Sequence, residues 1–177
     1  MFKLNAQELR AAKVDPEKAK LIPKNPIYII LDNILDTYNI GSIFRLADAV
    51  AAEEVIITGQ SETPPHTRIK KASINTTEWV KWSYKDTALK ALMELREKEP
   101  KLKVVAIEQN PKSIPYTEMK WEFPVALVVG NETTGVSKEV LDMADQIVEI
   151  PMWGVNKSLN VMVSLAIVLY QIVEDLG

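Results

Sequence analysis

Residues 124–171 carry the pattern that decides the fold, and they read PVALVVGNETTGVSKEVLDMADQIVEIPMWGVNKSLNVMVSLAIVLYQ. A short β-rich run over Val125–Val129 ends at Gly130, and a second run over Ile147–Ile150 ends at Pro151. Each run is followed by a loop rich in Gly, Asn, Ser or Thr that leads toward a predicted helix. Ligands bind to open α/β sheets in the crevice where strands end in such loops, so these two loops are the first place to look for a functional site.

The polar side chains of this stretch are concentrated in the two loops. Asn131 and Glu132 lie in the first loop, and the second holds Asn156, Ser158 and Asn160. Ser158 or Asn160 could equally serve as the N-cap of the following helix. The familiar phosphate-binding and dinucleotide-binding glycine motifs are absent, and two glycines at a spacing of five are a weak signal alone.

The rest of the chain alternates short apolar runs with helical patterns, which is typical of a parallel α/β sheet. We predict about five parallel strands flanked by helices, within a single domain spanning residues 1–177. Residues 5–22 are predicted to form one or two short helices, so residues 1–24 form a helical extension. The predicted strands are 27–31, 55–58, 104–107, 125–129 and 147–150, and the main helices are 40–52, 87–99 and 161–173.

Composition excludes several classes of chemistry. The 177 residues include no cysteine and one histidine, His66, which rules out disulfides and argues against a histidine-based metal site or a Ser-His-Asp triad. We therefore expect no metal. The N-terminus lacks an apolar signal-peptide core, and the apolar run Val161–Val173 is shorter than the roughly 20 residues of a membrane span. These features predict a cytoplasmic protein without a membrane anchor.

Charge is unevenly distributed along the chain. The net charge is −3, yet residues 1–24 and residues 61–85 each carry +3. Two basic segments on an acidic body fit a local phosphate-contacting surface, although solvated loops and helix faces explain them equally well. Trp79 and Trp82 alternate with Val80 and Lys81, which fits a short edge strand or an exposed aromatic patch. Such a patch could stack nucleobases, but tryptophans more often pack in a core. The candidate RNA-contacting residues in the second segment are Arg68, Lys70 and Lys71.

Arg45 is the charged residue of greatest interest in the first half of the chain. It follows the polar loop Asp32–Asn39 and lies early in the otherwise apolar helix 40–52. One interpretation is a surface pair with Asp48, worth only a few tenths of a kcal/mol. The other is contact with a phosphate group, which suits a guanidinium near a ligand crevice. The local sequence leaves both open.

Three segments, taken in order, resemble the motifs of the SpoU (TrmH) family of RNA 2′-O-ribose methyltransferases, within the SPOUT superfamily. Residues 39–45 match N-x-G-x-x-x-R, and residues 129–135 contain G-[NS]-E-x-x-G. Residues 150–152 read I-P-M, and residues 158–161 read S-L-N-V. The resemblance covers residues 27–172.

The resemblance implies an α/β fold with a C-terminal trefoil knot, a homodimer formed through the knot region, and S-adenosylmethionine as methyl donor. The strongly apolar helix 161–173 independently favours packing against a second subunit. The family further implies that backbone groups around four residues bind the cofactor and that Arg45 is the central catalytic residue, surrounded by four polar residues. The implied cofactor-binding residues are Ile107, Gly130, Ile150 and Leu159. The implied catalytic residues are Arg45, Asn39, Glu132, Ser158 and Asn160.

The implied reaction methylates a ribose 2′-OH in tRNA or rRNA. Because the pKa of guanidinium lies above about 12, we assign Arg45 to the substrate phosphate and the developing oxyanion, and leave proton removal open between Arg45, Glu132 and solvent. Alternatives are a base methyltransferase of the same superfamily and a non-catalytic RNA-binding or assembly protein. Two departures from the family pattern are Met162 and Ser164, where relatives commonly have a small residue and alanine. We also expect no counterpart of the N-terminal RNA-binding domain that many relatives carry.

Overall fold

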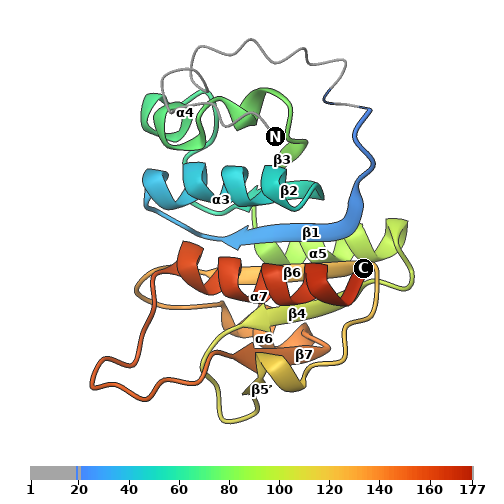
Figure 1. Ribbon diagram of the computed structural model, residues 1–177, viewed down its shortest axis with the longest axis vertical. Coiled ribbons are helices and arrows are strands. Elements are labelled where there is room, and N and C mark those ends of the chain that lie inside the picture. The colour runs from blue at the N-terminus through green and yellow to red at the C-terminus, as the bar shows by residue number, and fades with distance from the viewer. Residues whose placement is uncertain (1–18, 20, 177) are drawn as a thin grey trace.

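One sheet of seven parallel strands organises the part of the chain that the computed structural model describes, residues 19 and 21–176 (Figure 1). The strand order is β3-β2-β1-β6-β4-β7-β5. The predicted α/β class with a mostly parallel sheet is confirmed. The predicted helical extension over residues 1–24 lies almost wholly outside the described residues. The strands are β1 (Asn25–Asp32), β2 (Ala52–Thr58), β3 (Trp82–Lys85), β4 (Lys103–Ile107), β5 (Ile114–Pro115), β6 (Val125–Gly130) and β7 (Gln146–Glu149).

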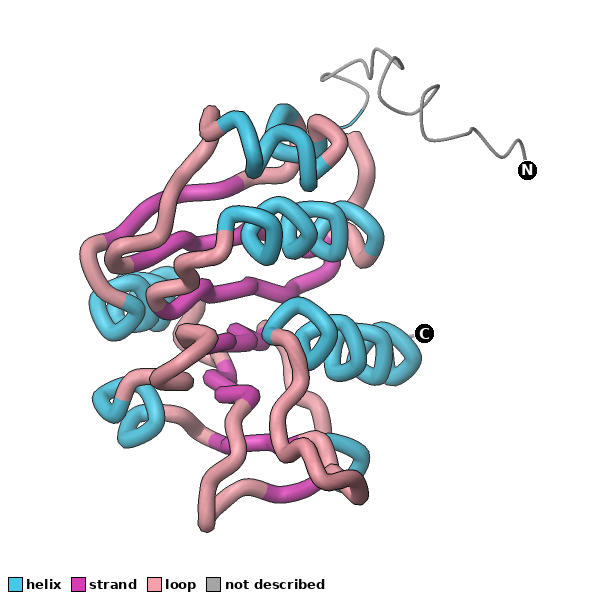
Figure 2. The backbone as a smooth tube through the Cα atoms, turned by 90° about the vertical axis from the view of Figure 1, so that its left-hand side faces the viewer, coloured by secondary structure: helices cyan, strands magenta, loops and turns pink. Residues whose placement is uncertain are grey.

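Helices cover both faces of the sheet, as Figure 2 shows. On one face lie α3 (Thr37–Ala49) and α7 (Val161–Leu176), which run side by side; on the other lie α5 (Ala88–Lys98) and α6 (Lys138–Met143). The short helix α4 (Thr67–Ser73) packs against α3. Two 3₁₀ turns, η1 (Thr76–Glu78) and η2 (Tyr116–Glu118), complete the described elements.

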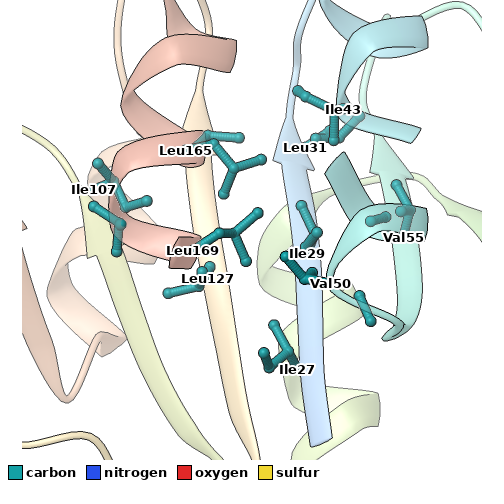
Figure 3. Close-up of a cluster of buried hydrophobic side chains, with 14 of the residues drawn as sticks. Ile27, Ile29, Leu31, Ile43, Val50, Val55, Ile107, Leu127, Leu165 and Leu169 are labelled. Carbon is teal, nitrogen blue, oxygen red and sulfur yellow. The ribbon is translucent and has the colours of Figure 1, made fainter. Parts of the chain in front are cut away.

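The central strands are continuously apolar because both of their faces are buried. Along β1, alternate residues such as Ile29 and Leu31 face α3 and α7, whereas Tyr28 and Ile30 face α5. Leu127 of β6 lies beneath Leu165 and Leu169 of α7 (Figure 3). This two-sided burial fixes the register of the strands, and with it the positions of the loops at their ends.

The structure has two strands besides the five predicted from apolar runs, and β3 begins at Trp82, at the end of the segment where a short edge strand was one alternative. Both are short strands at opposite edges of the sheet, β3 of four residues and β5 of two. Their side chains are mostly half-buried, so they lack the continuous apolar run that marks a central strand. Trp82 lies on β3 and meets the ring of Phe44 edge to face, with ring centroids 6.5 Å apart. Trp79 donates its indole N–H to Asp48.

The predicted start of the helix over residues 40–52 was wrong by about one turn. Helix α3 begins at Thr37 rather than Ile40, so Asn39 lies on its first turn and not in a loop. Asp36 caps the helix, because its carboxylate accepts the N–H of Tyr38 at 2.8 Å.

Helix α7 is apolar but not buried on every side in the single chain. Leu165, Val168, Leu169 and Ile172 are fully buried, while Val163 is 38% exposed and Tyr170 is 53% exposed. Within the described residues, no helix has the length and apolarity to cross a membrane.

Truncation of Leu127 to alanine should lower the free energy of unfolding by about 2–5 kcal/mol, because the cavity would open between the central strand and α7. Denaturant titration of the Leu127→Ala variant measures this loss. Met93→Ala, at a position that is 57% exposed on α5, is the control and should cost under about 1 kcal/mol. Equal losses in both variants would contradict the assigned core.

Candidate functional site

A cleft of about 250 Å³ opens where the C-terminal ends of β4, β6 and β7 meet. It lies between the loop 131–137, which follows β6, and the loop 150–160, which follows β7 and extends at the lower left of Figure 1. The cleft is lined by all four residues expected to bind the cofactor, and by two of the expected catalytic residues. These are Ile107, Gly130, Ile150 and Leu159, together with Glu132 and Ser158.

Two glycines make the first loop narrow enough to form this cleft. A Cβ atom on Gly130 would lie 2.1 Å from the backbone carbon of Gly135, which no side chain could tolerate. Gly135 itself has φ of +71°, and a Cβ there would lie 2.2 Å from the Glu108 carboxylate. The two glycines therefore let backbone groups approach each other, and leave backbone groups exposed to a ligand.

Asn131 fastens this loop to the neighbouring strand end. Its side-chain amide donates to the carbonyl of Asn33 at 2.9 Å, and its Oδ1 accepts the N–H groups of Thr133 and Thr134. Asn131 is buried and lines the cleft, and these hydrogen bonds fix the shape of the loop.

Glu132 joins the first sequence motif to the second. Its carboxylate accepts the backbone N–H groups of Leu35 and Asp36 at 3.1 and 3.0 Å. It also accepts the side-chain amide of Asn39 at 3.0 Å. Because β1 and β6 are neighbouring parallel strands, residues more than 90 positions apart in sequence meet here.

Hydrogen bonds lower the pKa of the Glu132 carboxyl. Partial burial alone would raise it, but the donation from Asn39 and from backbone N–H groups stabilises the anion and outweighs burial, so the pKa lies below its ordinary value of 4.5. Glu132 is therefore an anion at neutral pH.

The third motif joins the same set of hydrogen bonds through Asn160. Its amide group donates to Oδ1 of Asn39 at 3.0 Å, and its own Oδ1 accepts the N–H of Met162 at 2.9 Å. Asn160 thus caps α7, as one interpretation predicted, and its amide also contacts Asn39 of the first motif. The resulting hydrogen-bonded row is Glu132–Asn39–Asn160, with one member from each motif.

Two expected catalytic residues lie outside this row. Ser158 lines the cleft, but its N–H and hydroxyl both donate to Oδ1 of Asn156 within the same loop. Arg45 is exposed on α3, does not line the cleft, and forms no ion pair or hydrogen bond with any other described residue. The anticipated pair with Asp48 is absent, since Asp48 accepts the indole N–H of Trp79 at 2.7 Å instead.

The three candidate RNA-contacting residues lie together on α4, and all are exposed. Lys70 pairs with Glu78 at 3.3 Å, whereas Arg68 and Lys71 form no ion pair within the described part of the chain. Residues 19 and 21–176 contain no group of three or more His, Cys, Asp or Glu side chains that could hold a metal ion.

Three residues that line the cleft had no predicted role in the site. They are Glu108, Gln109 and Glu149. Glu108 accepts the N–H of Val136, and Gln109 donates to the carbonyl of Lys157. The signal that could have identified them is their position at the end of β4 or β7, beside the loops already suspected.

Comparison with known proteins agrees with this geometry. The sequence profile of the SpoU rRNA Methylase family matches residues 26–170. This chain belongs to the SpoU family. The resemblance read from the three motifs is thus confirmed.

Among curated SpoU relatives, the tRNA (guanosine(18)-2′-O)-methyltransferase of Aquifex aeolicus is 32% identical over 151 residues, covering 82% of this chain and 67% of the relative. The Escherichia coli K12 enzyme of the same name is 29% identical and matches 81% of this chain and 61% of its own length.

Solved structures show the same fold. The A. aeolicus TrmH/SpoU tRNA modifying enzyme has a TM-score of 0.78 at 27% identity, covering 95% of this chain and 80% of that one. The AdoMet-bound rRNA methyltransferase of Sinorhizobium meliloti has a TM-score of 0.79 at 25% identity, covering 96% and 60%. The chain therefore spans roughly three-fifths to four-fifths of the length of these relatives.

Replacement of Glu132 by glutamine should make the free energy of unfolding less dependent on pH in the acidic range. A carboxyl whose folded pKa is lowered contributes stability above its unfolded pKa, and that contribution is lost as the pH falls through the folded value. The wild-type protein should exceed Glu132→Gln in free energy of unfolding at pH 7 by no more than about 1 kcal/mol, because the side chain is partly exposed. The difference should shrink as the pH falls below 4.5.

Denaturant titrations between pH 3 and pH 7 measure this difference. Glu139→Gln, on an exposed side chain of α6 that accepts no side-chain hydrogen bond from a described residue, controls for the change in net charge. A difference that grows toward acid would show that Glu132 is not stabilised as an anion.

Proposed function

We propose that this protein transfers a methyl group from S-adenosylmethionine to a ribose 2′-OH of tRNA or rRNA, and that residues 1–177 form one domain. The observation that carries the proposal is the row Glu132–Asn39–Asn160, which brings one polar residue from each SpoU motif to the edge of a glycine-shaped cleft. Relatives named as tRNA 2′-O-methyltransferases support the RNA substrate, and work on tRNA also supports a location in the cytoplasm.

The cleft fits a nucleoside cofactor held mainly by backbone groups. Gly130 packs against the backbone of Gly135 without an intervening side chain, and Ile107, Ile150 and Leu159 supply apolar contacts to the cleft. When bound, S-adenosylmethionine supplies an electrophilic methyl group on a sulfonium. Backbone groups around these four residues would hold it, and the AdoMet-bound relative from S. meliloti supports this assignment.

The polar row would orient the ribose rather than accept its proton. Glu132 already accepts three N–H donors, and its lowered pKa makes it a weaker base than an ordinary carboxylate. Asn39 and Asn160 hold each other through their amides, so their free polar atoms are presented in a fixed orientation. Such positioning can lower the barrier by several kcal/mol. Ser158, at the cleft, would contribute a hydroxyl to the same task.

Arg45 would bind the substrate phosphate and stabilise charge that develops on the ribose oxygen. Its guanidinium has no ion-pair or hydrogen-bond partner among the described residues, so it is free to contact an anion. Because guanidinium stays protonated at neutral pH, and Glu132 is held as a weak base, we assign proton removal to solvent.

The exposed cationic side chains of α4 would bind RNA phosphates outside the reacting nucleotide. Arg68 and Lys71 form no ion pair with a described residue, whereas the charge of Lys70 is partly neutralised by Glu78. We therefore expect Arg68 and Lys71 to contribute more to RNA binding than Lys70 does. Trp79 and Trp82 are half-buried and pack within the fold, so we assign them no stacking role.

We propose that two chains form a homodimer across the face made by α3 and α7. Tyr38 is exposed on α3, and Val163 and Tyr170, seven residues apart, lie on an exposed stripe of the neighbouring helix α7. Tyr38 is 50% exposed and Tyr170 is 53% exposed, so the pair of helices presents apolar rings to solvent in the single chain.

A trefoil knot at the C-terminus is a further part of the proposal. The chain leaves β7, two strands away from β6, and returns through residues 150–160 so that α7 packs over β6 and against α3. That return path supports threading of α7 behind the loop at residues 131–137. An experimental backbone trace in which α7 can be drawn away without passing through a loop would exclude the knot.

Tritium transfer from S-adenosylmethionine to bulk tRNA and rRNA tests the activity, and mass spectrometry of RNA from a deletion strain then identifies the nucleotide. Cofactor binding without transfer to any RNA would favour the non-catalytic RNA-binding alternative instead. Transfer to a base rather than to ribose would favour the other methyltransferase class.

Arg45→Ala should lower the rate of methyl transfer by at least about 10²-fold, because no cation would then stabilise the negative charge on the phosphate and on the developing oxyanion. Cofactor affinity by calorimetry and the thermal unfolding midpoint should stay near wild type, since Arg45 neither lines the cleft nor contacts other described side chains. Near-normal turnover in this variant would refute the role of Arg45.

Sedimentation at micromolar concentration should give twice the chain mass of 19.9 kDa. Tyr170→Glu should shift the protein toward monomer, because it places a charge in the proposed interface. Met93→Glu introduces the same charge at an exposed position on α5, on the opposite face of the sheet, and should remain dimeric. A wild-type monomer would remove the dimer from the proposal.

A further inference from the structure

The strand between the two cleft loops ends in a pair of residues that contacts both of them. β4 lies between β6 and β7 in the sheet, and Glu108 and Gln109 follow it directly. Loop 131–137 leaves β6 on one side, and loop 150–160 leaves β7 on the other. These two loops form the first and the second wall of the cleft, and the end of β4 lies between them.

Glu108 holds the first wall. Its Oε2 accepts the N–H of Val136 at 2.9 Å, and its Oε1 accepts the N–H of Gln109 at 2.9 Å. The carboxylate also occupies the space where a side chain on Gly135 would lie. The glycine of the second motif is therefore packed directly on Glu108.

Gln109 holds the second wall. Its side-chain amide donates to the backbone carbonyl of Lys157. Within residues 151–159, the other side-chain hydrogen bonds stay inside the loop, from Lys157 to Met152 and from Ser158 to Asn156. Among the described residues, the amide of Gln109 thus forms the one hydrogen bond that ties this exposed segment to another element of the fold.

We propose that Glu108 and Gln109 are positioning residues that fix the separation of the two walls, with Gln109 acting as the latch of loop 150–160. This rests on the proposed function for the identity of the ligand, S-adenosylmethionine. Ile150 and Leu159 line the cleft at the two ends of the latched loop, so release of Lys157 would loosen both contacts. The pair therefore governs cofactor affinity, whereas the polar row Glu132–Asn39–Asn160 governs the transfer step.

Limited proteolysis of the ligand-free, full-length protein tests the latch without any cofactor. Trypsin cuts the peptide bond that follows Lys157, whose carbonyl is the group that Gln109 holds. We expect Gln109→Ala to be cut there several-fold faster than wild type, because loss of one hydrogen bond raises the open population of the loop. Mass spectrometry assigns the cleavage site.

Gln146→Ala is the matched control for this experiment. The amide of Gln146 also donates to a backbone carbonyl, that of Ile147 at 3.1 Å, but it does not line the cleft. Its cleavage after Lys157 should match wild type. Equal cleavage rates for Gln109→Ala and wild type would overturn the latch.

Calorimetry with S-adenosylmethionine tests the consequence for the cofactor. Gln109→Ala and Glu108→Gln should each raise the Kd roughly 5-fold. In Glu108→Gln, the side-chain NH₂ group would face one of the two backbone N–H groups that the carboxylate now accepts, and that hydrogen bond would be lost. The KM for the cofactor should rise in parallel while kcat at saturation changes less than about 2-fold. Glu139→Gln, which removes the same charge outside the cleft, should leave both constants unchanged.

The failures of the two proposals are distinguishable. Wild-type protein that does not bind S-adenosylmethionine would refute the proposed function, and the proteolysis result would still decide the latch. Normal cofactor binding by both variants, or a fall in kcat at constant KM, would refute the positioning roles while leaving the proposed function in place.

Discussion

The carboxylate of Glu132 is the interaction on which the arrangement of the site depends. It accepts hydrogen bonds from Leu35, Asp36 and Asn39, at the beginning of α3, although it belongs to the loop after β6. A negative charge at this end of a helix is favourable, because the first N–H groups of the helix lack partners and its dipole is positive there. Asn39, once held by Glu132, positions Asn160, which in turn begins α7. One anion therefore links the starts of two helices that are distant in sequence.

The sheet makes this link possible. β1 and β6 pair in parallel with Asp32 opposite Gly130, so the loops that follow them leave the sheet at the same level. Side chains only a few residues beyond each strand can then reach one another. The narrow Gly130–Gly135 loop keeps the cofactor cleft open directly beside this contact, so the groups that would orient the sugar lie next to those that would hold the methyl donor.

The central strands and much of the site could be predicted from sequence because their signals are local. Continuous apolar runs marked β1, β2, β4, β6 and β7, and the polar residues after β6 and β7 indicated where a ligand would lie. Parallel strand ends converge on one edge by geometry, so Glu132 and Asn160 could be expected near each other without knowledge of any contact. The family motifs then added Asn39, which the structure brings to both.

What the sequence did not reveal depends on partners distant in the chain or on the backbone. Helix α3 starts one turn earlier than predicted because Asp36 caps it, and the backbone N–H of Asp36 is in turn held by Glu132, which lies 96 residues away. Edge strand β5 is two residues long and half-buried, so it has no period, and β3 covers residues 82–85 rather than the predicted alternative of 79–82. Gln109 contacts a carbonyl oxygen, a group that every residue carries, so no residue type at position 157 could have signalled that contact.

The tip of loop 150–160 has a consequence for how enzymes of this kind diversify. An added Cβ on Gly154 would meet no atom within 4 Å, Val155 is fully exposed, and Trp153 is 90% exposed. We expect exchanges and insertions here to leave the folded core undisturbed, since the loop residues proposed to bind the ligand lie toward its ends and not at its tip. We expect this tip to be where related lineages vary most freely in length and chemistry, and where a fluorophore or affinity tag could be grafted close to the reaction centre.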